Sequence, residues 1–218
     1  MRKTFLIIGL GRFGMAIIKT LGDLNADVIA IDVDEKAVEE ASNYVEHCAI
    51  CDATRINALK EIAADSYDHA VVAIGNNLQA TILTIINLKE LGVKKISVRV
   101  DSNEYVKVME RLGADEIIIP EDEAAISFAN QIISDTILEY HPISKDFSMV
   151  KIKVGDKFEE HSIVDLDVRN KFDINIVGIT RNHTFYQPKA TDTIKSDDVL
   201  TVFGKSSKIN KFDRFINS

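Results

Sequence analysis

Short apolar segments alternate with segments of helical periodicity along the first 119 residues of this 218-residue chain. A nearly continuous apolar run is typical of a strand buried on both faces of a parallel sheet. Helical segments lie between these runs, for example at residues 35–42, 78–91 and 105–112. The alternation predicts an α/β fold with a Rossmann-like, doubly wound parallel sheet. Its six strands are expected at residues 5–8, 28–31, 45–50, 70–74, 96–100 and 116–119.

The first strand runs into a glycine-rich turn, GLGRFG, with glycines at positions 9, 11 and 14. Gly9 allows a sharp turn, Gly11 lets a pyrophosphate approach the backbone, and Gly14 lets the next helix lie close to the strand. A tight turn without a ligand is the alternative. The second strand ends in Asp32, 18 residues after Gly14, near where an acid that accepts hydrogen bonds from ribose hydroxyls is expected. This context favours nucleotide binding, and the carboxylate disfavours a 2′-phosphate because like charges would meet.

The carboxyl ends of the predicted strands carry residues suited to binding. In doubly wound sheets, ligands bind in the crevice outside these ends. The residues found there are Gly9, Asp32, Asp52, Gly75 and Arg99. We expect one crevice to collect all five.

The helical segment 78–91 has more apolar residues than the single buried stripe of a surface helix. They are Leu78, Ile82, Leu83, Ile85, Ile86 and Leu88. One face of a sheet cannot cover all of them. Deep burial under another helix is possible, but a subunit interface is the simpler explanation for a helix on the outside of a small domain. We therefore expect the chain to form oligomers.

The pattern changes after Pro120, where a long helix is expected over residues 121–138 and the sequence HPISKD at 141–146 then interrupts the chain. The apolar stripe of this helix consists of Ala125, Phe128, Ala129, Ile132, Ile133 and Ile137. Further strands are expected at 149–154, 174–180 and 199–203, with a short helix near 166–171. These elements predict a small α+β C-terminal domain. The expected organisation is a nucleotide-binding domain over 1–119, a crossover helix and linker over 120–144, and a C-terminal domain over 145–218.

The two parts of the chain differ in charge. Residues 1–144 contain 13 basic and 23 acidic residues, whereas residues 145–218 contain 13 basic and 11 acidic residues. The basic excess of the C-terminal part favours an anionic partner there, with a scatter of solvated lysines as the alternative.

Cysteine and histidine provide no evidence for catalytic or metal chemistry. Cys48 and Cys51 form a CxxC, but a tetrahedral zinc site needs four ligands, and a redox CxxC normally opens a helix instead of closing a strand. We interpret both as small buried apolar side chains. No two histidines have helical metal-ligand spacing; they are His47, His69, His141, His161 and His183.

The composition favours a cytoplasmic protein. No apolar run approaches the roughly 20 residues of a membrane span. Two cysteines and the lack of an export signal indicate a reducing compartment.

Taken together, these motifs resemble the RCK family, the TrkA-N plus TrkA-C regulators of potassium uptake, and most of all its KtrA type. The resemblance covers the whole chain. The matching motifs are GLGRFG (9–14), IDVD (31–34), DAT (52–54), VVAIGNNLQAT (71–81), GAD (113–115), PED (120–122) and SIVDLDVRNKFDINIVGI (162–179). Cys51 departs from the family, which often has glycine there, and this difference can alter the fit around adenine.

The resemblance implies a cytoplasmic ring, with an octamer built from homodimers as the expected assembly. It docks on a membrane potassium-translocating subunit of the KtrB or TrkH type and gates it according to bound ATP, ADP, NAD or NADH. Arg12 would contact a γ-phosphate held by a neighbouring subunit, and Glu121 would lie near the phosphates and help hold a divalent or monovalent cation. The implied nucleotide-binding residues are Gly9, Gly11, Arg12, Phe13, Gly14, Asp32, Asp52, Ala53, Thr54, Gly75, Arg99 and Glu121.

The resemblance also implies that the C-terminal domain dimerises and binds cyclic di-AMP. Arg169 supplies a guanidinium for a phosphate, and the backbone around Asn175 and Ile176 completes the phosphate contacts. Ile163 and Pro188 would line the adenine pocket. The alternative is that Arg169 pairs with Asp165 or Asp167 on its own short helix.

Two other classes of protein fit these residues less well. An NAD-dependent oxidoreductase with a small second domain would need a proton donor beside the nicotinamide, and no histidine has an obvious relay partner. A nucleic-acid-binding repressor would need a basic recognition helix, which a net charge of −8 makes unfavourable. The prediction is a non-enzymatic regulator.

Overall fold

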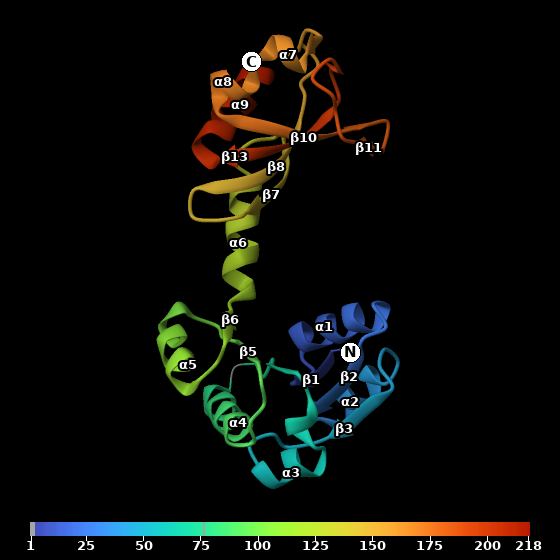
Figure 1. Cartoon of the computed structure of the whole chain (residues 1–218), viewed down its shortest axis with the longest axis vertical. Helices are drawn as coiled ribbons and strands as arrows, with labels where there is room; N and C mark the ends of the chain where they lie inside the picture. The colour runs from blue at the N-terminus through green and yellow to red at the C-terminus, as the bar shows by residue number, and fades with distance from the viewer. Residues whose placement is uncertain (1–2, 76) are drawn as a thin grey trace. The chain divides into compact units, whose positions relative to one another are not determined.

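The computed structural model describes residues 3–75 and 77–218. The chain divides into two compact units, Met1–Glu121 and Asp122–Ser218 (Figure 1). Each unit has its own sheet and its own core of buried apolar side chains, so the two are described separately.

The N-terminal unit is built on a six-stranded sheet with the order β3-β2-β1-β4-β5-β6, and every adjacent pair of strands is parallel. This is the strand order of a doubly wound Rossmann sheet, which confirms the predicted fold class. The strands are β1 (Thr4–Ile8), β2 (Asp27–Asp32), β3 (His47–Ile50), β4 (His69–Val72), β5 (Ile96–Arg99) and β6 (Glu116–Ile118). The helices between them are α1 (Arg12–Asp23), α2 (Glu35–Ala41), α3 (Ile56–Glu61), α4 (Leu78–Glu90) and α5 (Val106–Leu112).

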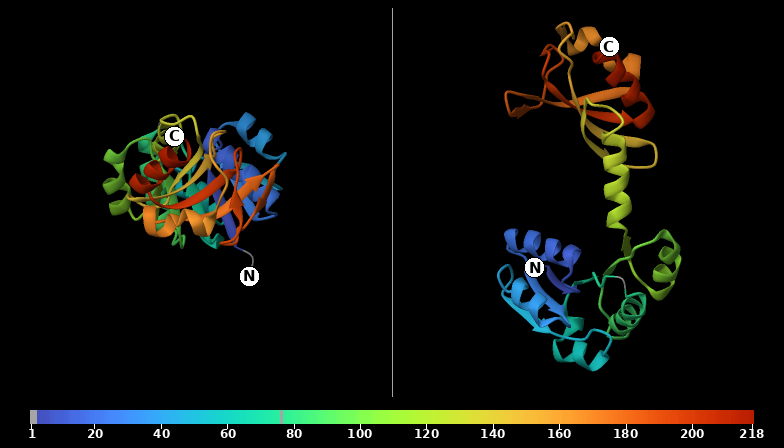
Figure 2. Two further views of the ribbon diagram at one scale, coloured as in Figure 1. Left: turned by 90° about the horizontal axis from the view of Figure 1, so that it is seen from above. Right: turned by 180° about the vertical axis from the view of Figure 1, so that it is seen from behind.

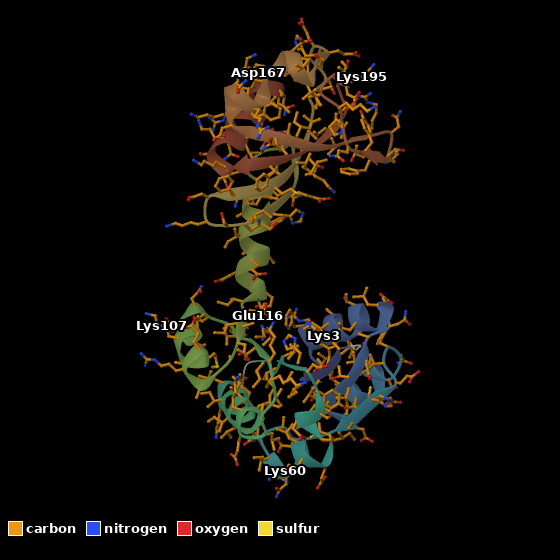
Figure 3. All side chains as sticks on the ribbon, in the orientation of Figure 1. Lys3, Lys60, Lys107, Glu116, Asp167 and Lys195 are labelled. Atoms are coloured by element: carbon orange, nitrogen blue, oxygen red, sulfur yellow. The ribbon has the colours of Figure 1, made fainter. Side chains whose placement is uncertain are left out.

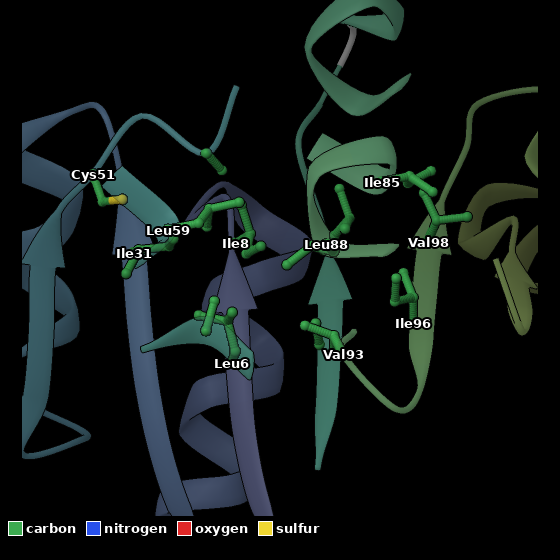
Figure 4. Packing of buried hydrophobic residues seen from close by; sticks show 14 of the residues in the cluster. Leu6, Ile8, Ile31, Cys51, Leu59, Ile85, Leu88, Val93, Ile96 and Val98 are labelled. Carbon is green, nitrogen blue, oxygen red and sulfur yellow. The ribbon is translucent and has the colours of Figure 1, made fainter. Parts of the chain in front are cut away.

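Apolar side chains are buried on both faces of this sheet. Leu6 and Ile8 point to one face, where they meet α3 and α4 in the cluster drawn in Figure 4. Ile7 between them packs on the other face against α1. Alternation along a strand sends successive side chains to opposite faces, so a continuous apolar run is needed when helices cover both.

The two cysteines lie in different cores. Cys51 packs with Ile31 and Leu59, whereas Cys48 belongs to the cluster on the opposite face with Val28 and Ile18. Both are free thiols. Their interpretation as small packing side chains agrees with this arrangement, and the intervening sheet prevents them from acting as one redox pair.

Helix α4 buries only one side. Ile85 and Leu88 are fully buried, while Leu78, Leu83 and Ile86 are each about two-fifths exposed. The apolar surface that the sequence indicated is therefore present on the outside of this unit. That it forms a subunit interface remains a prediction.

The helix expected over residues 121–138 is shorter than predicted. Helix α6 (Pro120–Gln131) ends early, and residues 137–142 form strand β7 (Ile137–Pro142). The buried Asp213 carboxylate explains the change, because it accepts hydrogen bonds from the hydroxyls of Ser134 (2.9 Å) and Thr136 (2.6 Å). These side chains favour turns over helix, and Ile137 then enters the core. The predicted apolar stripe is largely exposed, since no residue of α6 is buried.

The C-terminal unit has a five-stranded antiparallel sheet with the order β11-β10-β13-β8-β7. Its longer strands are β8 (Phe147–Lys153), β10 (Ile174–Arg181) and β13 (Val199–Lys205), and β11 (Thr184–Tyr186) is a short strand of the same sheet. Two further short strands, β9 (His161–Ser162) and β12 (Thr193–Ile194), form a separate two-stranded sheet. Helix α9 (Ser206–Ile216), drawn in red, packs on this sheet (Figure 2). The predicted small α+β domain is confirmed, although α9, β7 and the short strands were not predicted.

The single short helix expected near residues 166–171 consists of two helical turns. They are α7 (Ile163–Leu166) and α8 (Val168–Phe172), separated by Asp167, whose φ of 47° is left-handed (Figure 3). Phe172 of α8 packs edge-on against Phe212 of α9, with ring centroids 5.4 Å apart.

None of the helices in the described part of the chain has the length and hydrophobicity needed to cross a membrane.

Candidate functional site

A cavity of about 510 Å³ opens at the carboxyl edge of the N-terminal sheet. It lies where the chain leaves β1, β2, β3 and β4, the place at which doubly wound sheets bind ligands. Seven of the residues singled out from the sequence line it: Gly9, Gly11, Asp32, Asp52, Ala53, Thr54 and Gly75.

The glycine-rich turn has the geometry that its spacing predicts. Gly9 has a φ of +92°, and a Cβ there would lie 2.7 Å from the Ile74 nitrogen. A Cβ on Gly14 would overlap the Gly9 carbonyl oxygen, so Gly14 serves close packing of α1 and does not line the cavity. A Cβ on Gly11 would meet no atom within 4 Å. Gly11 therefore leaves space in front of the backbone amides that open α1.

Asp32 lines the cavity and also orders the turn. Its Oδ2 accepts a hydrogen bond from the Leu10 backbone N–H at 2.5 Å, and its Oδ1 accepts one from the Asp34 N–H at 2.9 Å. The carboxylate thus connects the end of β2 to the glycine-rich turn. A carboxylate has about four lone-pair sites, so it can still accept hydrogen bonds from ligand hydroxyls.

The DAT turn forms another wall of the cavity. Asp52 Oδ1 accepts hydrogen bonds from the Thr54 hydroxyl (2.6 Å) and the Thr54 N–H (3.0 Å). The hydrogen bond from this hydroxyl lowers the pKa of the Asp52 carboxyl. Asn87 Nδ2 donates to the Ala53 carbonyl (3.1 Å), so the turn is also tied to α4. Burial, with the neighbouring Asp52 and Glu61 charges, raises the pKa of the Cys51 thiol, which meets the cavity as a neutral group.

A second hollow of about 480 Å³ adjoins the first. Both are lined by Gly11, Ala73 and Gly75, so together they make a groove that passes the glycine-rich turn. The second hollow contains the remaining predicted residues except Gly14: Arg12, Phe13, Arg99 and Glu121. The five strand-end residues all line this groove, with Asp32 and Asp52 in the first hollow and Arg99 in the second. Strands β1 and β4 lie between β5, which ends at Arg99, and β2, which ends at Asp32.

Arg99 and Glu121 form an ion pair at the wall of the second hollow. Arg99 Nη2 lies 2.6 Å from Glu121 Oε1, and its Nη1 lies 2.9 Å from Asp101 Oδ1. The hydrogen bond from Arg99 lowers the pKa of the Glu121 carboxyl, and the charge of Arg12 acts in the same direction. Glu121 is therefore ionised at neutral pH.

Sequence reasoning missed several residues of the first cavity. They are Ile8, Val33, Ala73, Ile74, Asn77 and Ala80, besides Cys51, which was singled out only for the adenine fit. All but Ala80, which lies on α4, are within five residues of a strand end, and this position is the signal that would have found them. Asn77 also caps α4 by accepting a hydrogen bond from the Ala80 N–H at 3.0 Å. Asn76 of the matching motif lies outside the described residues.

The candidate residues of the C-terminal unit fall into two neighbouring groups. Arg169 on α8 lies beside β10, the strand that contains Asn175 and Ile176. Ile163 begins α7, and its N–H donates to the Asp192 carbonyl (3.0 Å) in the loop that follows Pro188. Among the residues that the structure describes, Arg169 forms no ion pair, because Asp165 bonds to Ser162 and Asp167 to Asn170. The structure thus does not support the alternative in which Arg169 pairs on its own helix.

Comparison with known proteins gives the family. The TrkA-N domain family matches residues 5–120, and the TrkA-C domain family matches residues 147–217. The chain is 40% identical to Ktr system potassium uptake protein C of Bacillus subtilis (strain 168), covering 98% of this chain and 97% of that protein. It is 34% identical to Ktr system potassium uptake protein A of the same organism, covering 97% of this chain and 96% of that protein.

A solved structure, the GsuK RCK domain, superposes on the whole chain with a TM-score of 0.69 at 12% identity, and this chain spans 48% of its length. At that identity it supports the RCK fold alone. The curated relatives are potassium uptake proteins, which confirms the prediction of a non-enzymatic protein over an oxidoreductase. With both domain families matched in order and relatives similar over nearly their full length, this chain belongs to the Ktr family of potassium uptake proteins, which join a TrkA-N to a TrkA-C domain.

Proposed function

We propose that this chain is a cytoplasmic, nucleotide-sensing subunit that controls potassium flux through a membrane subunit of the KtrB or TrkH type. The observation that carries the proposal is the groove at the carboxyl edge of the sheet, with the glycine-rich turn at its centre. Because the chain belongs to the Ktr family, we infer that the system it controls is a potassium uptake system. The proposed assembly is a ring of homodimers, with an octamer as the expected form, and the exposed apolar residues of α4 are available for contacts between chains.

The groove suits an adenine nucleotide. The adenosine half would occupy the first cavity with its ribose against Asp32, and the phosphates would cross Gly11 in front of the amides that open α1. They would then reach the second hollow and its Arg99 guanidinium, while Arg12, which also lines this hollow, would contact the γ-phosphate held by a neighbouring chain. ATP and ADP are the proposed ligands, and the second hollow also provides space for the other half of NAD or NADH.

A cation at Glu121 is part of the proposal, but the protein alone does not supply its ligands. Within residues 3–75 and 77–218, no group of three or more His, Cys, Asp or Glu side chains is arranged to hold a metal ion. A cation there would need phosphate oxygens to complete its coordination. Its binding would therefore depend on the nucleotide.

Calorimetry on the purified full chain tests the nucleotide site. ADP and ATP are each expected to bind once per chain, and mass spectrometry of the denatured protein should identify any adenine nucleotide that was retained through purification. NADH should bind without being oxidised. Absence of binding by both ADP and ATP would contradict the proposed function, and NADH turnover would favour the oxidoreductase alternative.

The C-terminal unit is proposed to bind cyclic di-AMP across a dimer. Each chain would supply one Arg169, whose planar pair of donors matches a phosphate. The backbone at Asn175 and Ile176 would complete the phosphate contacts, and Ile163 with Pro188 would line the adenine pocket. Arg169 is exposed and has no ion-pair partner among the described residues, so no internal contact has to break.

Replacing Arg169 with alanine is expected to weaken cyclic di-AMP binding by about 1.5 to 3 kcal/mol, because a hydrogen bond to a charged phosphate is lost. Calorimetry on the full chain, with the N-terminal site saturated by ADP, measures the change. Lys171→Ala is the matched control, since it removes a neighbouring exposed cation of α8 that the proposal does not place at the phosphate. Equal affinity of the wild type and Arg169→Ala, or no binding by the wild type, would leave the site unsupported.

A further inference from the structure

Arg99 connects the nucleotide groove to the first turn of α6. Its side chain is only 13% exposed, and its guanidinium donates to two carboxylates that come from different elements. Asp101 follows β5, on which Arg99 itself lies, whereas Glu121 belongs to the first turn of α6. The Arg99–Glu121 pair therefore ties the start of this helix to the edge of the sheet.

This tie acts at the boundary between the two compact units. Glu121 is the last residue of the N-terminal unit, and Asp122 is the first residue of the C-terminal one. No residue of α6 is buried, so no apolar side chain anchors its first turn in a core. The Arg99–Glu121 ion pair is therefore one of the polar contacts that hold this turn.

The same guanidinium faces the groove in which a nucleotide is proposed to lie. Arg99 lines the second hollow together with Arg12 and Glu121. A phosphate that enters this hollow meets the Arg99 guanidinium, and it also meets the ionised Glu121 carboxylate, which repels it. Phosphate and Glu121 are then two anions competing for the donors of one guanidinium.

Resting on the proposed function, we propose that Arg99 is a specificity and coupling residue. When a nucleotide binds whose phosphates extend beyond the α-phosphate, Arg99 exchanges its partner Glu121 for these further phosphates. The exchange releases the first turn of α6. An adenosine monophosphate occupies the first cavity without reaching Arg99. The β- and γ-phosphates of ATP, or the second phosphate of a dinucleotide, enter the second hollow. There they accept the hydrogen bonds that Arg99 donates to Glu121 when no nucleotide is bound. The number of phosphates in the nucleotide thereby determines whether the first turn of α6 is held by Arg99 or released.

Hydrogen exchange at the start of α6, combined with nucleotide titrations, tests the exchange of partners. In an α-helix the amides of Ala124 and Ala125 bond to the carbonyls of residues 120 and 121, so their protection reports on the first turn. In the wild type without divalent cations, which could bridge Glu121 and the phosphates, ATP is expected to raise their exchange rate and AMP is not. An NADH titration shows whether a dinucleotide acts as ATP does.

Three variants separate the steps. Arg99→Gln should show fast exchange at Ala124 without nucleotide, and should bind ATP roughly tenfold more weakly with unchanged AMP affinity, because a charge-assisted contact is lost. Glu121→Gln should also show fast exchange without nucleotide, but should bind ATP more tightly in the absence of divalent cations. Asp101→Asn is the matched control: it removes the other carboxylate partner, outside α6, and should leave the exchange at Ala124 as in the wild type.

The outcomes distinguish this inference from the proposed function. If AMP and ATP both fail to bind the wild type, the proposed function falls and the inference falls with it. If both bind but Arg99→Gln keeps its ATP affinity, or if ATP leaves the exchange at Ala124 unchanged in the wild type, the proposed function stands and the role of Arg99 is overturned.

Discussion

Replacing Gly14 with alanine is expected to lower the free energy of unfolding of the N-terminal unit by about 3 kcal/mol, at the upper end of the range for overpacking a tight contact. The added methyl group would overlap the Gly9 carbonyl oxygen. Neither partner can move easily, because Gly9 has a positive φ and lies against the backbone of residues 73 and 74. Urea unfolding followed by circular dichroism measures the change.

Gly11→Ala is the matched control for this substitution. A Cβ at Gly11 meets no protein atom within 4 Å, and its φ of −65° suits alanine, so stability should stay close to that of the wild type. The methyl group would instead occupy the space over which the phosphates are proposed to pass. Gly11→Ala is therefore expected to fold normally and lose nucleotide affinity. A Gly14→Ala protein as stable as the wild type would show that the close packing of α1 on the turn is not needed.

Replacing Asp32 with alanine is expected to weaken ADP and ATP binding by about 1 to 3 kcal/mol, because the ribose hydroxyls lose their acceptor. The same change removes the acceptor for the Leu10 N–H, so the glycine-rich turn loses one of its restraints. Calorimetry with each nucleotide measures the effect.

Asp34→Ala controls for general damage to this segment. Asp34 lies two residues further on and caps α2 by accepting a hydrogen bond from the Lys36 N–H at 3.0 Å. Losing this cap should reduce stability by about 1 kcal/mol, and nucleotide affinity should change little, because Asp34 does not line the cavity. Unchanged affinity in Asp32→Ala would refute the ribose assignment.

The sheet of the N-terminal unit could be predicted from the sequence because its pattern is local and redundant. Each strand is an apolar run between helical segments, and the observed strand ends differ from the predicted ones by at most two residues. The helical stripes were less predictable. For example, Leu24 at the end of α1 is 70% exposed, whereas Met15 and Ile18 within the helix are buried. Which side of a helix is covered depends on how the sheet twists beneath it, and the sequence does not contain that directly.

The end of α6 could not be predicted, for a different reason. Residues 132–138 keep an apolar pattern that fits a helix, but the chain turns at Ser134 because Asp213 binds its hydroxyl. These two residues are 79 positions apart in the sequence. Tertiary contacts of this kind override local propensity.

The candidate site, too, could be predicted from the sequence in part only. Residues at strand ends were found because the topology brings the carboxyl ends of parallel strands together. Two contacts were not foreseen: the hydrogen bond from Leu10 to Asp32, and the ion pair between Arg99 and Glu121. Both involve side chains whose directions depend on the path of the chain after each strand, and that path was visible only in the structure.

Potassium flux into vesicles that contain the membrane subunit and this chain, measured with ATP and with ADP, decides whether the chain is a nucleotide-reading gate. Arg12 opens α1, is exposed and forms no ion pair among the described residues, so it is available to a γ-phosphate held by a neighbouring chain. The wild type is expected to give different fluxes with the two nucleotides. Arg12→Ala should bind both and lose the difference, while Arg111→Ala, at an exposed arginine of α5, should keep it. Equal wild-type flux with ATP and ADP, or continued switching by Arg12→Ala, would contradict this account.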